Sequence, residues 1–288
     1  MSPEQYCRER AARSGSNFYL SFAFLPADQR RAITALYAFC REVDDVVDES
    51  SEPELARARL DWWRSEVERL YAGQPQHPVT RALAPWLDTY SIGRRRLVEI
   101  IDGMQMDLEQ DRYADFEGLR LYCHRVAGVV GLLSAGIFGA RQESTLRYAA
   151  ELGLALQLVN IVRDVGEDAR RNRIYLPIED LLHFGVGAHE ILAIRPSDRF
   201  VELMRFQAER ARTTCARALA FLEPQEARRQ KPGLMMAAVY FTLLDEIERD
   251  GFRVLTHRTS LPPARKLWIA LRTWMSGATH LPGGRRNR

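Results

Sequence analysis

Apolar residues along the chain recur at intervals of three and four positions rather than two, which is the periodicity of amphipathic helices. Prolines and glycines divide this pattern into long segments, and no alternating run predicts a strand. We therefore expect an all-α fold with helices at about 27–49, 53–71, 93–110, 116–139, 144–171, 198–222, 233–251 and 263–275. The prolines between 75 and 85 predict a short irregular link.

The chain shows no sign of a boundary between domains. It contains no low-complexity linker, no change of composition and no repeat of fixed period. Its 288 residues, 46% of them hydrophobic, suffice for a large core and exclude disordered, collagen-like and disulfide-scaffold proteins. The prediction is one all-α domain at 1–276, followed by a flexible tail at 277–288.

Charge and cysteine content narrow the functional class and the compartment. The formal charge is only +3, so the composition does not favour binding to nucleic acid. The four cysteines are widely spaced, as expected of free thiols in a reducing compartment. The N-terminus is polar rather than apolar, and the longest uncharged stretch, 126–140, is too short to cross a bilayer. We expect a cytoplasmic protein without a signal peptide or transmembrane helix.

The helix predicted after Pro26 has a polar line beside its apolar stripe. The line contains, at spacings of four, three and four, Tyr37, Arg41, Asp44 and Asp48. These side chains therefore share one face at the border of the core. The pattern fits a solvated face with an ion pair between Arg41 and Asp45, and it equally fits one wall of a polar cleft.

A second polar line runs along the helix predicted at 144–171, which is otherwise apolar nearly all round. The line contains, at spacings of three, four and four, Gln157, Asn160, Asp164 and Asp168. Buried carboxylates are unfavourable unless cations or donors compensate them. Either an internal ion pair with Arg163 or Arg173, or a bound cation, would supply that compensation.

Each of these two helices carries one D-x-x-x-D pair. If the helices face one another, four carboxylates converge on a cavity, and their oxygens suit Mg²⁺, with Mn²⁺ as an alternative. Proteins often hold Mg²⁺ with one or two carboxylates and substrate phosphates, so nearby arginines and tyrosines suit a diphosphate. These neighbours are Arg41, Arg173, Tyr37 and Tyr175. Because the chain lacks a P-loop, nucleotide phosphoryl transfer is disfavoured.

The segment YCHRVAGVVGLLSAGIFG, residues 122–139, is apolar and rich in small residues. Small side chains let helices pack closely, and they also leave room for a long apolar ligand. Core packing accounts for any one of these residues. Together with a diphosphate site, the segment indicates a substrate with a charged head and a hydrocarbon tail.

Three segments of the chain resemble the squalene and phytoene synthases, head-to-head prenyltransferases of the all-α isoprenoid synthase fold. They are DDVVD at 44–48, YCHRVAGVVG at 122–131 and LQLVNIVRDVGEDARRNRIYLP at 156–177. The resemblance extends from about residue 14 to about residue 251. Within the family, the segments at 231–252 and 265–272 look most like presqualene diphosphate synthases of bacterial hopanoid pathways. The resemblance implies a single-domain helical bundle around a central cavity.

The resemblance also implies roles for individual residues. The expected Mg²⁺ ligands are Asp44, Asp48, Asn160, Asp164 and Asp168. The expected diphosphate contacts are Ser16, Asn17, Arg41, Arg173 and Tyr175. The expected lining of the prenyl channels is Phe18, Tyr37, Val126, Ala127, Gly128, Gln157 and Tyr240. The expected catalytic residues are Asp44, Asp48, Asp164, Asp168, Tyr37 and Arg41. Asn17 departs from the family pattern, because many relatives have a small hydroxyl residue there.

The activity implied by the resemblance is the 1'-1 condensation of two farnesyl diphosphates to presqualene diphosphate and diphosphate, in squalene and hopanoid biosynthesis. The alternatives are squalene or dehydrosqualene synthesis, phytoene synthesis from geranylgeranyl diphosphate, and a non-catalytic helical binding protein. NADPH use stays open, and we expect no requirement for it. Because the product is a lipid, we expect transient contact with the inner face of a membrane and with downstream enzymes. Residues 267–275, LWIALRTWM, are either an amphipathic membrane patch or a core helix.

Overall fold

The computed structural model describes residues 1–13, 21–48, 50, 52–276 and 281. In these residues the regular secondary structure is helical, and one isolated bridge joins Arg112 to Ile174. The all-α fold predicted from the apolar periodicity is confirmed. Within the same residues, no helix is both long and apolar enough to cross a membrane. The predicted tail, 277–288, lies outside the described residues except for Leu281, which is buried.

The long helices begin and end close to the predicted limits. They are α3 (Ala27–Asp48), α4 (Pro53–Tyr71), α6 (Arg94–Glu109), α9 (Glu143–Arg170), α12 (Asp198–Phe221), α14 (Lys231–Arg249) and α15 (Pro263–Ser276). Local chemistry explains several of these limits. Pro53 occupies the first turn of α4, and the Ser197 hydroxyl accepts a hydrogen bond from the Phe200 N–H at the start of α12. Beyond α9, Asn172 adopts a left-handed conformation (φ 60°) that ends the helix.

Several helical segments differ from the prediction or were not predicted. The helix expected at 116–139 consists of α7 (Phe116–Cys123), the π-helical segment η2 (His124–Gly128) and α8 (Val129–Ile137). The expected link at 75–85 contains α5 (Pro78–Leu83) and part of the 3-10 helix η1 (Ala84–Trp86), because proline is well tolerated in a first helical turn. The remaining short helices are α1 (Pro3–Arg13), α10 (Ile178–His183), α11 (Ala188–Leu192) and α13 (Pro224–Ala227).

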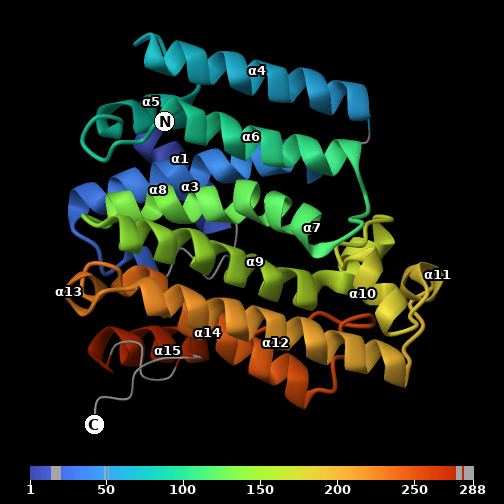
Figure 1. Cartoon of the computed structure of the whole chain (residues 1–288). Helices are drawn as coiled ribbons and strands as arrows, with labels where there is room; N and C mark the ends of the chain where they lie inside the picture. Colours follow the sequence, from blue (N-terminus) through green and yellow to red (C-terminus); the bar gives the residue numbers. More distant parts are fainter. Residues whose placement is uncertain (14–20, 49, 51, 277–280, 282–288) are drawn as a thin grey trace.

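The helices lie side by side in a stack, from α4 at the top of Figure 1 through α3, α8 and α9 to α14 and α15 at the bottom. Apolar side chains form one buried cluster around α3, α4 and α6, and another around α9, α12 and α14. Val126 in η2 packs against both clusters. Helix α8 contacts both α3 and α9, so it connects the two helices that carry the aspartate pairs.

Two glycines allow the segment at 122–139 to approach α9 closely. A Cβ added to Gly131 would lie 2.3 Å from the carbonyl oxygen of Ala149, and one added to Gly153 would lie 2.4 Å from that of Ala127. Any larger residue at either position would force the backbones apart. Close packing is therefore one function of the small residues in this segment.

Candidate active site

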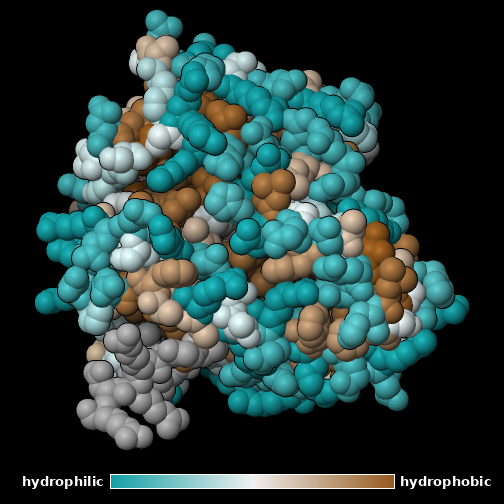
Figure 2. Space-filling model, in the orientation of Figure 1, coloured by the Kyte–Doolittle hydropathy of each residue, from teal (hydrophilic) through white to brown (hydrophobic). Residues whose placement is uncertain are grey.

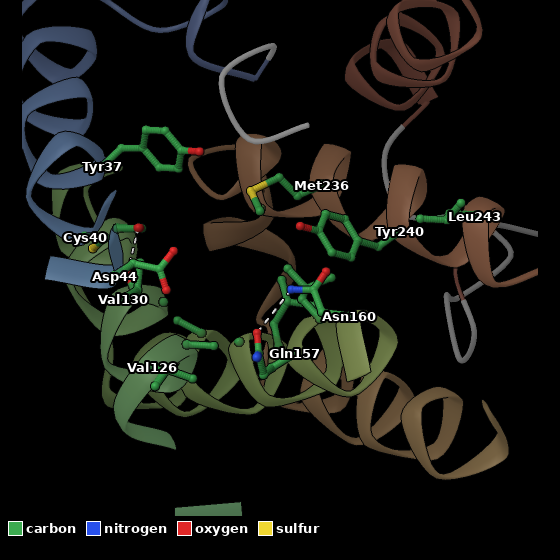
Figure 3. Close-up of a pocket in the computed structure, with 18 of the residues that line it drawn as sticks. Tyr37, Cys40, Asp44, Val126, Val130, Gln157, Asn160, Met236, Tyr240 and Leu243 are labelled. Carbon is green, nitrogen blue, oxygen red and sulfur yellow. Dashed lines mark hydrogen bonds between the residues drawn. The ribbon is translucent and has the colours of Figure 1, made fainter. Parts of the chain in front are cut away.

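A cavity of about 550 Å³ lies between α3, η2, α8, α9 and α14. Figure 3 shows Tyr37 and Asp44 of α3 across the cavity from Met236 and Tyr240 of α14. Along α9, the lining residues run from Tyr148 to Arg163, a length of about 22 Å at the rise of an α-helix. The cavity is thus long enough to hold an extended ligand.

The two ends of the cavity differ in polarity. Near Arg163, the wall carries Asp44, Gln157, Asn160 and Arg258. Toward Tyr148, the wall is formed mainly by apolar or small residues, among them Phe138, Ala149, Leu152 and Gly233. The shape and polarity suit an amphiphile whose charged head lies near Asn160.

The structure places five of the predicted channel residues on the cavity wall. They are Tyr37, Val126, Ala127, Gln157 and Tyr240. Gly128 is buried and is not part of the lining, and its missing side chain would lie 2.9 Å from the His124 ring. Phe18, and the predicted diphosphate contacts Ser16 and Asn17, lie outside the described residues.

The aspartates of α3 are held by arginines on both sides. Arg41 Nη1 lies 2.5 Å from Asp44 Oδ2, and its Nη2 lies 2.7 Å from Asp45 Oδ1. The ion pair to Asp45 and the polar cleft, which the sequence offered as alternatives, are therefore both present. Burial raises the pKa of Asp44 to about 6 against the opposing effect of Arg41, and the charge of Asp48 adds to the rise.

Asp48 connects α3 to the end of α9. Its Oδ1 lies 2.9 Å from Arg171 Nη1 and 3.5 Å from Arg173 Nη1, and both arginines follow the last turn of α9. The two predicted aspartate helices are thus joined by ion pairs beside the polar end of the cavity. Arg173, a predicted diphosphate contact, is engaged with Asp48 and does not line the cavity itself.

The two aspartates of α9 have different surroundings. Asp164 forms ion pairs with its neighbour Arg163 and with Arg258, whose Nε lies 2.8 Å from Oδ1. Within the described part of the chain, Asp168 has no ion pair. Burial, together with repulsion from Asp164 and Asp107, raises the pKa of Asp168 to about 8. Asp168 is therefore the carboxylate with the greatest need for a cation.

Asp107 of α6 is a fifth carboxylate that the sequence analysis missed. Its oxygens accept hydrogen bonds from the hydroxyls of Tyr175, at 2.8 Å, and Tyr122, at 3.0 Å. Burial raises its pKa to about 6, although Arg173 opposes the rise. Tyr175 therefore holds Asp107 rather than lining the cavity, whereas Tyr122 does line it. The only sign of Asp107 in the sequence was its position as an acidic residue directly after the apolar Met104 and Met106.

Three cations at the polar end were also missed as site residues. Arg163, Arg258 and Lys266 all line the cavity. Burial, with the charges of Arg163 and Arg258, lowers the pKa of Lys266, as expected where cations are crowded. Such a cluster attracts an anionic group. Arg258 and Lys266 are far from Asp164 in sequence, so no local spacing indicated that they would meet.

The side chains at the polar end fit a hard divalent cation. Among the described residues, the buried Oδ1 of Asn160 has no hydrogen-bond partner, and Asp168 is a half-buried carboxylate without an ion pair, whose raised pKa Arg173 and Arg171 oppose. In the same residues, no three carboxylate, imidazole or thiol groups lie close enough to share one ion. Mg²⁺ is commonly bound by one or two carboxylates with phosphate oxygens and water, so this arrangement suits it.

The predicted convergence of four carboxylates on the cavity is only partly observed. Asp44 lines the cavity, whereas the lining does not include Asp48, Asp164 or Asp168. The reason is that arginines hold Asp48 and Asp164. The carboxylates surround the polar end rather than forming a single cage.

Comparison with known proteins agrees with this geometry. The family model for squalene/phytoene synthases matches residues 11–265. A phytoene synthase of Arthrospira platensis is 37% identical over 279 residues, which cover 91% of this chain and 89% of that protein. A chloroplastic phytoene synthase of Narcissus pseudonarcissus is 34% identical, with 91% of this chain and 63% of that protein covered.

Solved structures show the same fold. A dehydrosqualene synthase crystallised with a ligand superposes with a TM-score of 0.84 at 26% identity, covering 95% of this chain and 96% of the other. The squalene synthase HpnC of Alicyclobacillus acidocaldarius gives a TM-score of 0.75 at 30% identity, covering 87% and 94%. With its intact aspartate pairs and long cavity, the chain belongs to the squalene/phytoene synthase family, and it is an enzyme of the class that joins prenyl diphosphates head to head.

Proposed function

We propose that the enzyme condenses two farnesyl diphosphates to presqualene diphosphate, releasing one diphosphate, and that it requires Mg²⁺. The observation that carries this proposal is one continuous cavity whose apolar wall leads to a cluster of carboxylates and cations. The apolar part suits a hydrocarbon chain and the polar end suits a diphosphate. Mg²⁺, when bound, would neutralise the charge that develops on the departing diphosphate.

The residues of this chain would prepare the reaction by binding and orientation. Asp44, Asp48, Asp164, Asp168 and Asn160 would hold the metal ions. Arg41, Arg173, Arg258 and Lys266 would contact the diphosphates. Holding two prenyl chains side by side in one cavity would supply much of the rate by proximity.

The chemical step would proceed in a site from which water is excluded. The bond between the allylic carbon and the diphosphate oxygen of one substrate breaks, leaving an allylic cation. The rings of Tyr37 and Tyr240 face the cavity and would stabilise this cation. The double bond of the second substrate then attacks the cation, and loss of one proton closes the cyclopropane ring.

The released diphosphate is a better candidate than a tyrosine for the acceptor of that proton. Burial raises the pKa of Tyr240, and it raises that of Tyr122 well above the ordinary value. Both tyrosines therefore stay protonated at neutral pH and are poor bases. The proposed reaction is complete without a reductant, so no NADPH is required.

A second candidate function is phytoene synthesis from two geranylgeranyl diphosphates. It is favoured by the curated relatives, several of which are phytoene synthases at 34–37% identity. A geranylgeranyl chain is one isoprene unit longer, so the end of the cavity formed by Phe138 and Tyr148 would decide between the substrates. A smaller residue at 138 would then favour the longer chain.

Product analysis tests the proposal. Purified enzyme is incubated with Mg²⁺ and either farnesyl or geranylgeranyl diphosphate, with and without NADPH, and the products are identified by mass spectrometry before and after phosphatase treatment. Presqualene diphosphate from farnesyl diphosphate in both mixtures is the expected result. Phytoene formed only from geranylgeranyl diphosphate would favour the second function, and squalene formed only with NADPH would show a complete squalene synthase.

The location proposed for this enzyme is the cytoplasm, with contact at the inner face of a membrane. The reason is chemical, because a product with two prenyl chains partitions into lipid. The enzyme that consumes it must therefore take it from a bilayer or directly from this protein.

A further inference from the structure

Helix α15 turns an apolar face away from the protein. Its inward positions are Ile269, Ala270 and Thr273, which are buried. Its outward positions include Leu267, Trp268, Leu271 and Met275, and the exposed fractions of Trp268 and Met275 are 58% and 72%. A surface helix normally presents polar residues to water, so this outward face needs another explanation.

Positive charge accompanies this face. Residues 251–288 contain eight arginine and lysine residues and no aspartate or glutamate, whereas the rest of the chain has more acidic than basic residues. On α15 itself, Arg265 and Arg272 are exposed beside the apolar positions, and Arg265 also pairs with Glu246 of α14 at 2.6 Å. The guanidinium of Arg272 lies 5.2 Å from the centre of the Trp268 ring. An apolar stripe with basic neighbours is typical of helices that lie in an anionic membrane interface.

A second exposed apolar group on the protein lacks this charge. Figure 2 shows brown side chains at the right edge of the molecule, where Figure 1 places α10. On α10, Leu182 is 76% exposed and Ile178 is also exposed, but the same helix carries the exposed Glu179 and no lysine or arginine. Exposed apolar area alone therefore does not distinguish α15, whereas its combination with positive charge does.

The position of α15 connects this face to the cavity. Residues Arg258, Thr259, Ser260 and Leu261, which lead into α15, line the cavity together with Lys266 of its first turn. The outward face of α15 and the polar end of the cavity are thus parts of one short stretch of chain. The segment that leads into α15 would connect a membrane in contact with that helix to the polar end of the cavity.

We propose that the outward face of α15 binds the surface of a bilayer that contains anionic lipids. Trp268, Leu271 and Met275 enter the boundary between headgroups and acyl chains, and Arg265 and Arg272 contact the headgroups. This proposal assigns the membrane contact of the proposed function to one surface of the protein and to anionic lipids. It rests on the proposed function for the purpose of the contact, which is the transfer of a lipid product.

Vesicle sedimentation with the full chain tests the proposal. The vesicles consist of phosphatidylcholine alone, or of phosphatidylcholine mixed with phosphatidylglycerol. We expect binding to the anionic vesicles that weakens as salt is added, and at least about tenfold weaker binding by the double variant Trp268→Glu, Leu271→Glu. The matched control, the double variant Ile178→Glu, Leu182→Glu, places the same charge on the other exposed apolar group and should bind as the unchanged protein does.

Three outcomes would overturn the proposal. The first is the absence of binding to anionic vesicles, and the second is equal binding by the double variant and the unchanged protein. The third is that the double variant loses self-association but keeps vesicle binding, which would make α15 a contact between two copies of the chain. Turnover of farnesyl diphosphate dispersed in detergent separates this proposal from the proposed function. The double variant should keep that turnover, whereas vesicle binding without any turnover in the unchanged protein would contradict the proposed function alone.

Discussion

The aspartate pairs of α3 and α9 have the same spacing but are neutralised in different ways. On α3, Asp44 pairs with Arg41 of the same helix, and Asp48 pairs with Arg171 and Arg173, which follow α9. On α9, Asp164 pairs with Arg163 of the same helix and with Arg258 of a distant loop, whereas Asp168 has no ion pair in the described part of the chain. The pKa of Asp44 is raised to about 6 and that of Asp168 to about 8.

This difference shows where the fold keeps unfavourable charge. Both aspartates of the α3 pair have arginine partners, so their charge is partly compensated without a ligand. The pair on α9 lies on a helix buried nearly all round, and it keeps one carboxylate, Asp168, whose raised pKa the nearby Arg173 and Arg171 oppose without forming an ion pair. We infer that the electrostatic free energy of the α9 pair changes more than that of the α3 pair when metal and diphosphate bind.

Removal of one aspartate from either pair should have the largest effect on turnover. Asp44→Ala or Asp164→Ala should lower turnover by about a hundredfold or more, because preorganised charge at the departing group contributes this much to catalysis. Helix content, measured by circular dichroism, should be unchanged. Asp28→Ala, an exposed aspartate at the start of α3, is the control and should retain full activity. Substantial residual activity in either site variant would contradict the assignment of that pair.

Loss of the distant counterion of α9 should have a smaller effect. Arg258→Gln removes one ion pair to Asp164 and one cation from the polar end of the cavity. We expect the KM for the prenyl diphosphate to rise about tenfold, as for the loss of one charge-assisted contact. Arg265→Gln, which breaks only an exposed pair with Glu246, serves as control. A fall in kcat without a change in KM would place Arg258 in the chemical step instead.

Binding of Mg²⁺ with inorganic diphosphate should raise the melting temperature by several degrees, because the ligands bind only the folded state. The relief of repulsion around Asp168 adds to this gain. The Asp168→Asn variant should show a smaller increase than the unchanged protein. An equal increase in both proteins, measured by differential scanning fluorimetry, would show that the ligands bind away from α9.

Stability should also depend on pH in the metal-free protein. The pKa of Asp168 rises from an ordinary 3.8 to about 8 on folding, so between these values the folded state binds more protons than the unfolded state. The free energy of unfolding should therefore fall as pH rises from about 4 to about 8, and Asp44 adds to the fall below pH 6. Melting temperatures in EDTA should fall less steeply with pH for Asp168→Asn. An equal slope would contradict the raised pKa.

The sequence allowed the long helices and both aspartate pairs to be predicted because these depend on local periodicity. A long apolar run broken by one polar line identifies α9, and spacings of three and four place Gln157, Asn160 and Asp164 on that line. The helix α1 was missed because it buries only Cys7 and Ala11 and has little apolar stripe to detect. The π-helical turn at 124–128 was missed because its sequence does not differ in period from an ordinary helix.

The tertiary partners of the site could not be predicted by spacing. Asp107 and Tyr175 are far apart in the chain, and they meet only because α6 packs beside the segment that follows α9. Arg258 reaches Asp164 from the loop before α15 for the same reason. These contacts depend on helix packing, which the pattern of one helix does not specify.

The most direct test of the account is a crystal structure with Mg²⁺ and the unreactive analogue farnesyl thiodiphosphate. We expect metal ions bound by the aspartates of both α3 and α9, with the prenyl chain extending past Gln157 toward Tyr148. A thiodiphosphate bound elsewhere, or at this cavity without contact between metal and either aspartate pair, would contradict the central claim that the two pairs form one diphosphate site.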